Sequence, residues 1–217
     1  PLCAHLSWCV PQAPRCKPSL DHLIVIMQGD WIAPNATVIG NVSLGAGSSL
    51  WHSVIVRGDT AAVTIGKNST VQDLTRIASN KAQPGDKVTI GDNVYIGANA
   101  TLDACTVEDN SFVGMGASLS RGSKVEAFGV LAAGSSLAEG QTVYSGQIFA
   151  GCPAQYLRDL TQEEKHLMSE HKLEMQQLSQ IYCEETEKNF REQLNSIDDR
   201  IRYRRQDPQE KMIDKLG

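Results

Sequence analysis

The chain lacks any apolar run long enough to cross a membrane, because its longest, Leu23-Ile24-Val25-Ile26-Met27, is only strand-sized. It is also poor in aromatic residues, at 6%, and has no large excess of either charge, with a net charge of −5. That charge gives no general attraction to nucleic acid. Apolar residues at 41% and charged residues at 21% of 217 are typical of a soluble globular chain. We therefore expect one core with an appended segment, lying at most against a membrane or membrane proteins.

Two other signals are absent. The sequence begins at Pro1 rather than at a methionine, so a targeting signal is not visible in it. There is also no C-x-x-C pair, although three of the six cysteines fall in the first sixteen residues, so a zinc site there is weakly indicated at most. We expect unpaired thiols in a loosely ordered arm, with a disulfide between two of them as the alternative. The cysteines are Cys3, Cys9, Cys16, Cys105, Cys152 and Cys183.

Aliphatic residues recur at every sixth position through the middle of the chain. Small or turn-forming residues such as glycine, alanine, serine and asparagine follow them. A six-residue period fits neither an amphipathic helix nor a strand that alternates every two residues. It is typical of a parallel β-helix, in which six residues make one flat face and one turn. Eighteen positions carry the repeat: Ile32, Val38, Leu44, Leu50, Val56, Ile65, Val71, Ile77, Ile90, Ile96, Leu102, Val107, Val113, Leu119, Val125, Leu131, Leu137 and Val143.

The repeat predicts a prism in which one aliphatic side chain per hexapeptide points inward and small residues occupy the tight corners. Three faces per coil turn the repeat into about six coils, roughly 29 Å tall at a strand spacing of about 4.8 Å. The predicted fold class is an all-β core, a parallel β-helix, with a C-terminal α-helix. We expect an N-terminal arm over 1–28, the β-helix domain over 29–154, and a C-terminal helix with a basic tail over 155–217.

Breaks in the six-residue register mark insertions. The spacing between Val56 and Ile65 is nine, so three residues are extra. The spacing that ends at Ile90 is thirteen, which leaves seven extra residues at 79–85, and one residue is missing just before Val107. Insertions in a solenoid bulge outward as loops and often mark the working face. We therefore expect any site to lie beside these two insertions.

The composition changes after residue 154, because glycine is then absent until Gly217. Thr161-Gln162-Glu163-Glu164 has the pattern of a capping box and predicts a helix over about 162–190. We expect this helix to pack along a prism face or across a subunit boundary. The basic cluster at 200–205 has two interpretations, a solvated tail or a docking strip for an acidic partner or lipid head groups. The apolar residues of the helix are Leu167, Met168, Met175, Leu178, Ile181 and Tyr182.

Several strings between Gly29 and Leu160 are more specific than the repeat. On them the chain resembles the γ-class carbonic anhydrases, and more narrowly their relatives attached to mitochondrial respiratory complex I. The resemblance implies a left-handed coil, although parallel crossovers are normally right-handed. The strings are Ser53-Val54-Ile55-Val56-Arg57-Gly58-Asp59, Ile90-Gly91-Asp92-Asn93-Val94, Cys105-Thr106-Val107-Glu108-Asp109, Val113-Gly114-Met115-Gly116-Ala117, Phe149-Ala150-Gly151-Cys152-Pro153-Ala154 and the segment 157–164.

The resemblance also implies a trimer with zinc between neighbouring prisms, held by three histidines. One follows the Gln-Asp pair by five residues, which is Ala78 in this chain. The other two positions are Ala98 and Asp103. Catalytic zinc needs three protein ligands and an open position for water, and a methyl group donates nothing. Asp103 alone cannot build such a site, so we predict no metal and no cofactor.

The family pattern retains other polar residues. We expect Arg57 and Asp59 to form an ion pair across a subunit boundary, and Gln72 and Asp73 to close the polar boundary between prisms. Binding of a small anion such as bicarbonate is the less favoured interpretation. His52 is the only histidine inside the repeat, and we expect it to be a surface or interface residue rather than a displaced ligand.

The leading hypothesis is a non-catalytic structural subunit of a trimer, built with paralogous γ-carbonic-anhydrase-like chains and docked on membrane-arm subunits of complex I. Its expected place is the matrix side of the mitochondrial inner membrane, peripheral to the lipid, with lipid contact through its termini and no nucleic acid partner. One alternative is a free trimer that binds bicarbonate or carbon dioxide, or that acts with zinc-competent partner chains. Another is a hexapeptide acyltransferase that uses coenzyme A, for which His52 is the only base in the coils.

Overall fold

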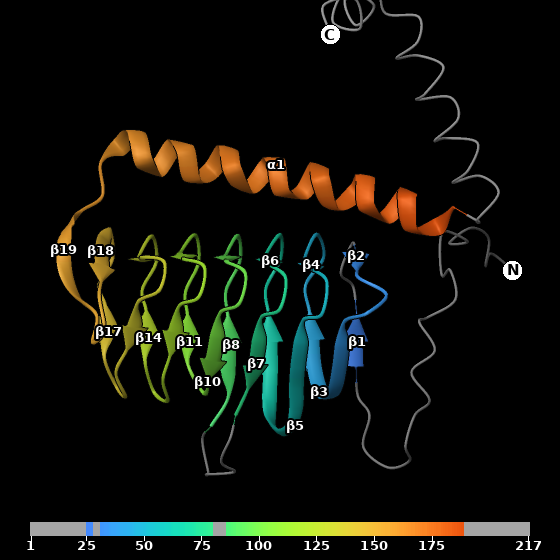
Figure 1. The fold of residues 1–217 in the computed structure, drawn as a ribbon, viewed down its shortest axis with the longest axis horizontal. Coiled ribbons are helices and arrows are strands. Elements are labelled where there is room, and N and C mark those ends of the chain that lie inside the picture. Colours follow the sequence, from blue (N-terminus) through green and yellow to red (C-terminus); the bar gives the residue numbers. More distant parts are fainter. Residues whose placement is uncertain (1–24, 28–30, 80–85, 189–217) are drawn as a thin grey trace, which may run out of the picture.

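A computed structural model describes residues 25–27, 31–79 and 86–188. Within them, nineteen short strands precede one helix (Figure 1). Cys3, Cys9 and Cys16 of the N-terminal arm lie outside the described residues, and so does the basic cluster at 200–205. Residues 80–85 of the longer insertion also lie outside them.

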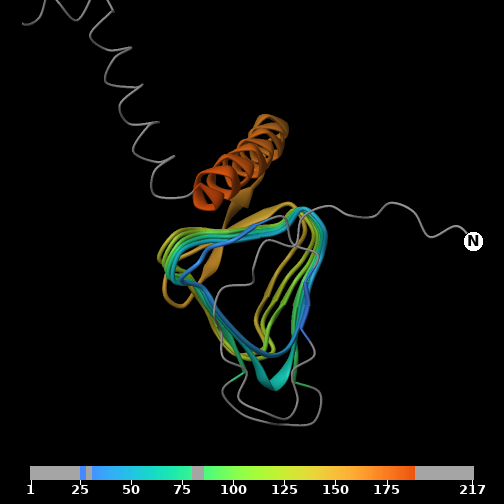
Figure 2. The same cartoon turned by 90° about the vertical axis from the view of Figure 1, so that its right-hand side faces the viewer.

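The strands stack as a parallel β-solenoid of about six coils with a triangular cross-section (Figure 2). We call the three sides face one, face two and face three, in the order in which each coil visits them. Neighbouring coils pair in register, as Leu50 with Val71 and Val71 with Ile96. Face one consists of β2 (Trp31–Ile32), β4 (Ser49–Leu50), β6 (Thr70–Val71), β9 (Tyr95–Ile96), β12 (Phe112–Val113), β15 (Val130–Leu131) and β18 (Gln147–Ala150).

Faces two and three form one continuous sheet because two long strands cross the corner between them. These are β3 (Thr37–Leu44) and β5 (Ile55–Ile65). Face two adds β7 (Arg76–Ala78), β10 (Thr101–Asp103), β13 (Ser118–Leu119) and β16 (Ser136–Leu137). Face three adds β1 (Val25–Met27), β8 (Val88–Ile90), β11 (Thr106–Val107), β14 (Lys124–Val125) and β17 (Thr142–Val143).

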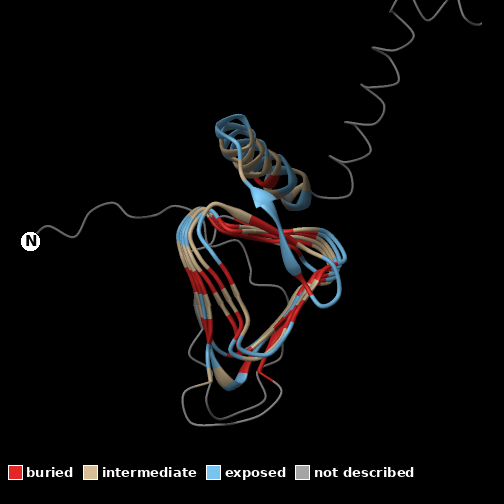
Figure 3. Ribbon diagram, turned by 90° about the vertical axis from the view of Figure 1, so that its left-hand side faces the viewer, coloured by how far each residue is buried: buried red, intermediate tan, exposed pale blue. Residues whose placement is uncertain are grey.

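The core consists of the predicted repeat residues. Of the eighteen, sixteen are at most 2% exposed, and the other two, Ile32 and Val38, are partly buried and pack against the core. The prediction of a hexapeptide β-helix with about six coils is confirmed. Figure 3 shows the buried segments along the walls of the triangle, each interrupted at the corners.

The two ends of the solenoid differ from the expected boundaries. β1 pairs with β3, so the sheet already begins within 1–28, the segment expected to be an arm. At the other end β19 (Gln155–Asp159) returns antiparallel to β18 and extends face one past residue 154. The turn between them places Ala154 in the core at 1% exposure.

The first insertion is not a loop. The three extra residues after Val56 are absorbed by β5, which continues through eleven residues and bends at the corner, where it forms the wedge below the triangle in Figure 2. Gly58 lies in this strand because the backbone of Asn41 in the preceding coil occupies the space that a side chain would need. The missing residue before Val107 is accommodated at the same corner, where Ala104 adopts a left-handed conformation with φ of 42°.

The helix α1 (Gln162–Glu187) begins at the predicted capping box. The Thr161 side chain accepts from the Glu164 amide at 3.2 Å, and the Glu164 carboxylate accepts from the Thr161 amide at 3.0 Å. α1 runs back along face one over the whole stack (Figure 1). In the described residues, no helix is both long and apolar enough to cross a membrane.

Candidate functional site

Two of the three expected ligand positions lie together. Ala78 ends β7 and Asp103 ends β10, and the two residues are direct partners in the parallel ladder. Arg57 is the partner of Ala78 in the coil before. These three residues therefore form a column at the corner between faces two and three, beside both insertions. Ala78 is buried and Asp103 is half-buried.

Ala98 lies at a different corner. It follows β9 and precedes β10, in the turn between faces one and two, where its carbonyl accepts from the Gly116 amide at 2.8 Å. The same column contains His52, Asp73 and Met115, joined by backbone hydrogen bonds from coil to coil. Strand β10 begins after this corner and ends with Asp103 at the other corner of face two. One chain therefore does not bring Ala78, Ala98 and Asp103 together.

Gln72 and Asp73 contact the helix α1 and the corner between faces one and two, not the column of Ala78. The Gln72 amide donates to the sulfur of Met175 on α1 at 3.4 Å. Asp73 accepts from the His52 amide at 2.9 Å and so joins two coils. Both residues are half-buried. The expectation that they close a boundary between prisms stays a prediction for Asp73, whereas Gln72 is directed at the helix of its own chain.

Arg57 and Asp59 form an ion pair within one chain, with 2.6 Å between Nη2 and Oδ2. The two residues are two apart on β5 and therefore point to the same side of the strand. The hydrogen bond with Asp59 raises the pKa of Arg57, and the same bond lowers the pKa of Asp59. Both side chains are exposed at the wedge of β5, so the pair remains accessible to another chain.

A shallow cavity of about 200 Å³ adjoins Asp103 at the corner between faces two and three. Its other lining residues are Ser120, Arg121 and Glu139. The Arg121 guanidinium forms a fork with Asp86, including Nε to Oδ1 at 3.2 Å, and so fastens the end of the longer insertion to the prism. The Arg121 guanidinium is already paired with Asp86, and the carboxylates of Asp103 and Glu139 line the cavity. The negative charge of the cavity therefore disfavours the binding of bicarbonate.

His52 is part of an aromatic cluster that was not predicted from the sequence. Its ring lies 5.5 Å from the Trp31 ring and 6.0 Å from the Tyr182 ring of α1. Tyr182 also contacts the Trp51 ring at 5.1 Å, and the two tryptophans are buried. We call these four residues the helix anchor. The available signal was the placement of two tryptophans next to hexapeptide strands in a chain poor in aromatic residues.

The donor atoms at the expected ligand positions do not fit a catalytic zinc. Two alanines supply none, and Asp103 supplies one carboxylate where three ligands are needed. Among the residues that the structure describes, no group of three or more His, Cys, Asp or Glu side chains is placed to hold a metal ion. The residues at these positions therefore support no reaction step through zinc.

Comparisons with known proteins place these features in a family. The model for the hexapeptide repeat of succinyl-transferases matches residues 87–121. Gamma carbonic anhydrase 1, mitochondrial, of Arabidopsis thaliana is 39% identical over 177 residues, 77% of this chain and 62% of that protein. Gamma carbonic anhydrase 2, mitochondrial, from the same plant is 38% identical over 169 residues, 74% of this chain and 59% of that protein. The chain belongs to the γ-carbonic-anhydrase-like proteins of the hexapeptide-repeat superfamily.

The solved structures agree with the fold of this γ-carbonic-anhydrase-like chain. The crystal structure of a hexapeptide transferase family protein from Anaplasma phagocytophilum superimposes with a TM-score of 0.68 at 35% identity, over 73% of this chain and 91% of that one. The chain spans about three fifths of the length of the two Arabidopsis proteins, and the names of both describe them as mitochondrial.

Proposed function

We propose that this γ-carbonic-anhydrase-like chain is a non-catalytic structural subunit of a trimer that docks on the matrix side of mitochondrial complex I. One observation carries the proposal. The positions that the resemblance assigns to zinc ligands are Ala78, Ala98 and Asp103, which together offer one donor side chain, while the polar frame around them is retained. The chain keeps the surface for assembly and lacks the groups for hydration chemistry.

The placement of these positions supports a site shared between chains. Ala78 and Asp103 lie at one corner of face two and Ala98 lies at the other. A second prism that sets its Ala98 corner against the Ala78 corner of the first completes the set of three. Repeating that contact around a three-fold axis closes a ring, in which face two of every chain turns toward its neighbours.

Exposed apolar side chains on the same surface also support assembly there. Ile39 and Ile55 project outward from β3 and β5 on face two. Leu74 and Met115 lie at the corner between faces one and two and are 62% and 61% exposed. We call these four residues the lateral strip. An isolated chain gains nothing from them, whereas a neighbouring prism removes them from water.

The mitochondrial relatives and the helix that covers face one support the docking part of the proposal. Partner chains are paralogous γ-carbonic-anhydrase-like proteins, and the contact with membrane-arm subunits is peripheral. Blue-native electrophoresis of mitochondria, with antibody against this chain, tests this. We expect the chain to migrate with complex I and to leave that band when the complex is dissociated. Migration only as a free trimer would overturn the docking proposal and retain the assembly.

The zinc content of the purified trimer tests the loss of the site. A chain without ligands leaves the zinc site incomplete at both interfaces that it forms. A trimer with one copy of this chain therefore keeps one complete zinc site at most. We expect no more than one zinc per trimer containing this chain. A value clearly above one, measured by elemental analysis against protein concentration, is incompatible with the proposal.

A second function depends on the partner chains. If two zinc-competent partners flank this chain, the third interface remains complete, and the trimer hydrates carbon dioxide through it. Residual activity that disappears when the partners' ligands are replaced, and not when Asp103 is replaced by alanine, identifies this case. An acyltransferase is disfavoured, because the His52 ring that would act as its base packs against Trp31 and Tyr182 and its Nδ1 lies 3.1 Å from Oδ1 of Asn35. Acetyl transfer that is lost in His52→Ala would restore it.

A further inference from the structure

The large apolar side chains that the solenoid exposes to water fall into two groups among the residues that the structure describes. The lateral strip is one group and faces the neighbours in the proposed ring. The second group belongs to the last coils and to β19, and it lies outside that strip. We call it the end cluster. Its members are Phe128, Tyr144, Tyr156 and Leu157, which are 39%, 57%, 53% and 59% exposed.

Two members of the end cluster lie at the corner between faces three and one, in successive coils. Phe128 precedes β15, and Tyr144 follows β17. The two turns are joined, because Oγ of Ser145 donates to the Ala127 carbonyl at 2.7 Å. The aromatic side chains of both turns therefore belong to one stretch of surface.

Strand β19 adds the other two members beside the same corner. It ends there, because the Leu160 amide donates to the Gly146 carbonyl at 2.8 Å. The Tyr156 ring packs against the Phe149 ring at 6.3 Å, at the end of the core. Figure 1 shows β18 and β19 together at the end of the stack where α1 starts. The end cluster is therefore continuous from the corner to the end of the solenoid.

Phe128 has a backbone conformation that its residue type avoids. The corresponding positions in the three preceding coils are Asn68, Asn93 and Asn110, with φ of 54°, 54° and 58°, whereas Phe128 has φ of 59°. Asparagine adopts the left-handed region readily, and a bulky residue is strained there. The Phe128 ring contacts Lys165 of α1 at 6.0 Å and still remains partly in water. An exposed aromatic residue held under strain indicates a contact outside the chain.

The edge of β19 is also open. This strand is the outermost of the eight-stranded sheet, and all five of its residues are exposed. In the part of the chain that the structure describes, no strand pairs with its outer edge. Proteins cover such edges or interrupt them, and the pairing of β19 with β18 has a register shift at Ile148 and Phe149. The shift disfavours addition of a regular strand, so a partner covers this end mainly through side chains.

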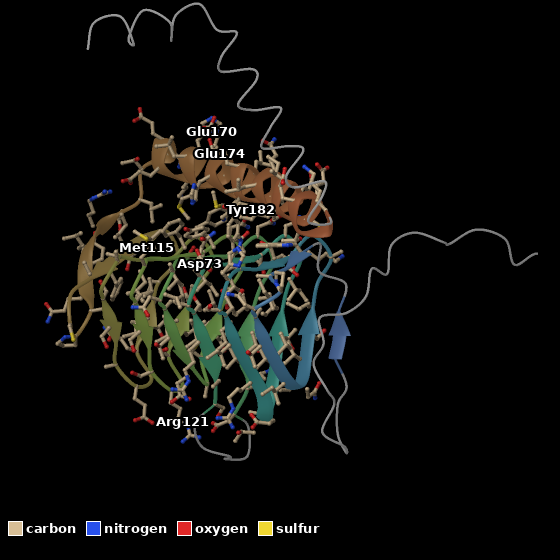
Figure 4. The ribbon with its side chains drawn as sticks, turned by 45° about the vertical axis from the view of Figure 1, so that its right-hand side comes forward. Asp73, Met115, Arg121, Glu170, Glu174 and Tyr182 are labelled. Carbon is tan, nitrogen blue, oxygen red and sulfur yellow. The ribbon has the colours of Figure 1, made fainter. Side chains whose placement is uncertain are left out.

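The proposed ring leaves the end cluster free. Ala98 and Asp103 belong to the same coil, so the contact between their corners joins neighbouring prisms at equal height. The prisms therefore stand side by side with their last coils at the same end of the ring. Figure 4 shows the two corners that this contact uses, with Met115 at the corner below α1 and Arg121 at the far corner. The end cluster lies at the third corner.

The charged groups around the end cluster are already paired within the chain. The Arg158 guanidinium donates to both carboxylate oxygens of Glu164, at 2.8 Å and 2.6 Å. The Tyr156 hydroxyl donates to Asp159 at 3.2 Å, and the Glu126 carboxylate accepts from the Ser145 amide at 3.2 Å. Because Arg158 is occupied and two carboxylates lie nearby, this surface disfavours anionic lipid head groups. It fits a protein surface that is apolar and uncharged.

We propose that the trimer docks on complex I through the end cluster, which rests on the function proposed above and names the face that docking uses. The partner presents an uncharged, largely aliphatic surface there. About half of each aromatic side chain is exposed, so the three aromatic residues together leave roughly 300 Å² in water. Apolar patches of this size on a single chain are often functional, and aromatic residues are enriched in the cores of protein interfaces.

Blue-native electrophoresis tests the proposal, in mitochondria where the double variant Tyr144→Ser with Leu157→Ser replaces the parent chain. We expect the variant to form the trimer, and the amount that migrates with complex I to fall at least about tenfold, as truncation of central interface residues does. Both positions are more than half exposed, so the fold retains its stability. Sedimentation velocity of the purified trimer checks the assembly.

The matched control is the double variant Leu167→Ser with Leu173→Ser. These leucines of α1 are 60% and 59% exposed and lie outside the end cluster, so this variant should stay with complex I. Loss of both double variants from the band overturns the assignment to the end cluster. Retention of both overturns the assignment alone and leaves the proposed function standing. A parent chain that does not migrate with complex I overturns the proposed function and this surface together.

Other occupants of the end cluster give different results. A double variant Tyr144→Ser with Leu157→Ser that no longer forms the trimer assigns the cluster to the interface between chains. Parent trimers that sediment as pairs, and variant trimers that do not, assign it to a second copy. Flotation of the parent trimer with vesicles of phosphatidylcholine and cardiolipin, lost in the variant, assigns it to lipid. Each of these results overturns docking of the end cluster on complex I.

Discussion

Leu74 allows the proposed interface to be tested by a substitution with opposite effects on the chain and on the assembly. It has φ of 58°, in the left-handed region that bulky residues avoid, and is 62% exposed at the corner between faces one and two. The corresponding position in the next coil is Asn99, with φ of 57°, joined to the same column by hydrogen bonds. The change Leu74→Asn therefore places at this corner the residue type that its neighbour already uses.

The two effects follow from separate quantities. Left-handed backbone costs a bulky residue about 1–2 kcal/mol, and asparagine adopts it more easily, so the isolated chain gains up to about 1 kcal/mol. Complete burial of a leucine is worth about 1.5–3 kcal/mol, so burial of the exposed 62% contributes about 1–2 kcal/mol to each interface that contains it. Asparagine cannot supply this. Each interface should weaken by about fivefold to thirtyfold in its dissociation constant.

The assay pairs two measurements on one sample. Thermal unfolding at a concentration where the chain is monomeric should show a midpoint raised by about 2–4 °C. Sedimentation velocity over a concentration series should show dissociation of the trimer at higher protein concentration than for the parent chain. Phe128→Asn is the matched control. Phe128 also has a left-handed φ of 59° but lies at the corner between faces three and one, near Lys165 of α1.

The reasoning about the interface is refuted if Leu74→Asn dissociates at the same concentration as the parent chain while the control behaves likewise. Leu74 would then be an exposed leucine without a partner. If Leu74→Asn also lowers the thermal midpoint of the monomer, the assignment of backbone strain at this corner is wrong as well. The two errors are distinguishable because they appear in different measurements.

Three further outcomes are expected. Tyr182→Ala should open the helix anchor, shift tryptophan emission to the red as Trp31 and Trp51 become wet, and lower stability by about 2 kcal/mol, whereas unchanged emission would contradict the anchor. The hydrogen bond from Arg158 lowers the pKa of Glu164 to about 2, so the start of α1 should lose stability as the pH falls from 4.5 toward 2, and Glu164→Gln should remove that dependence in hydrogen exchange. Burial lowers the pKa of Lys172 to about 8. Between pH 8 and 10.5 the unfolded chain therefore binds more protons than the folded chain, and the free energy of unfolding should rise with pH across that window. Lys172→Met should flatten this rise and raise the thermal midpoint at pH 7.

The solenoid was predictable from single residues because every coil has the same packing requirement. One inward aliphatic side chain per hexapeptide is needed at every level, so Leu102 and Leu119, partners in the ladder, can be assigned to the core without knowledge of their neighbours. The capping box at Thr161 is equally local, because its two hydrogen bonds join residues three apart. These features need no information about distant contacts.

The candidate site was predictable only in part. The column of Ala78 and Asp103 follows from the repeat, since the register fixes which residues stack. The in-chain pairing of Arg57 with Asp59 and the packing of His52 under Tyr182 depend on how far side chains reach and on which face the helix covers. The helix pattern alone left that face open, because α1 has apolar residues on more than one side, as Leu167 and Ile181 show. The spacing predicts a loop for the three extra residues of β5, because it does not distinguish an insertion from a longer strand.

Because α1 is attached to the solenoid at both ends, its length must match the height of the stack of coils. At one end Arg158 and the capping box fasten the helix beside the last coil, and at the other Tyr182 meets Trp31 of the first. The 21 residues from Thr161 to Tyr182 span roughly 31 Å, close to the height of six coils at about 4.8 Å each. One coil more would require about three helical residues more, which turn the helix by about 300° rather than a full circle and rotate Tyr182 away from the prism. Repeat proteins commonly change length by gaining or losing units. Here the helix is attached to the first and the last coil, so the number of coils and the length of the helix can change only together.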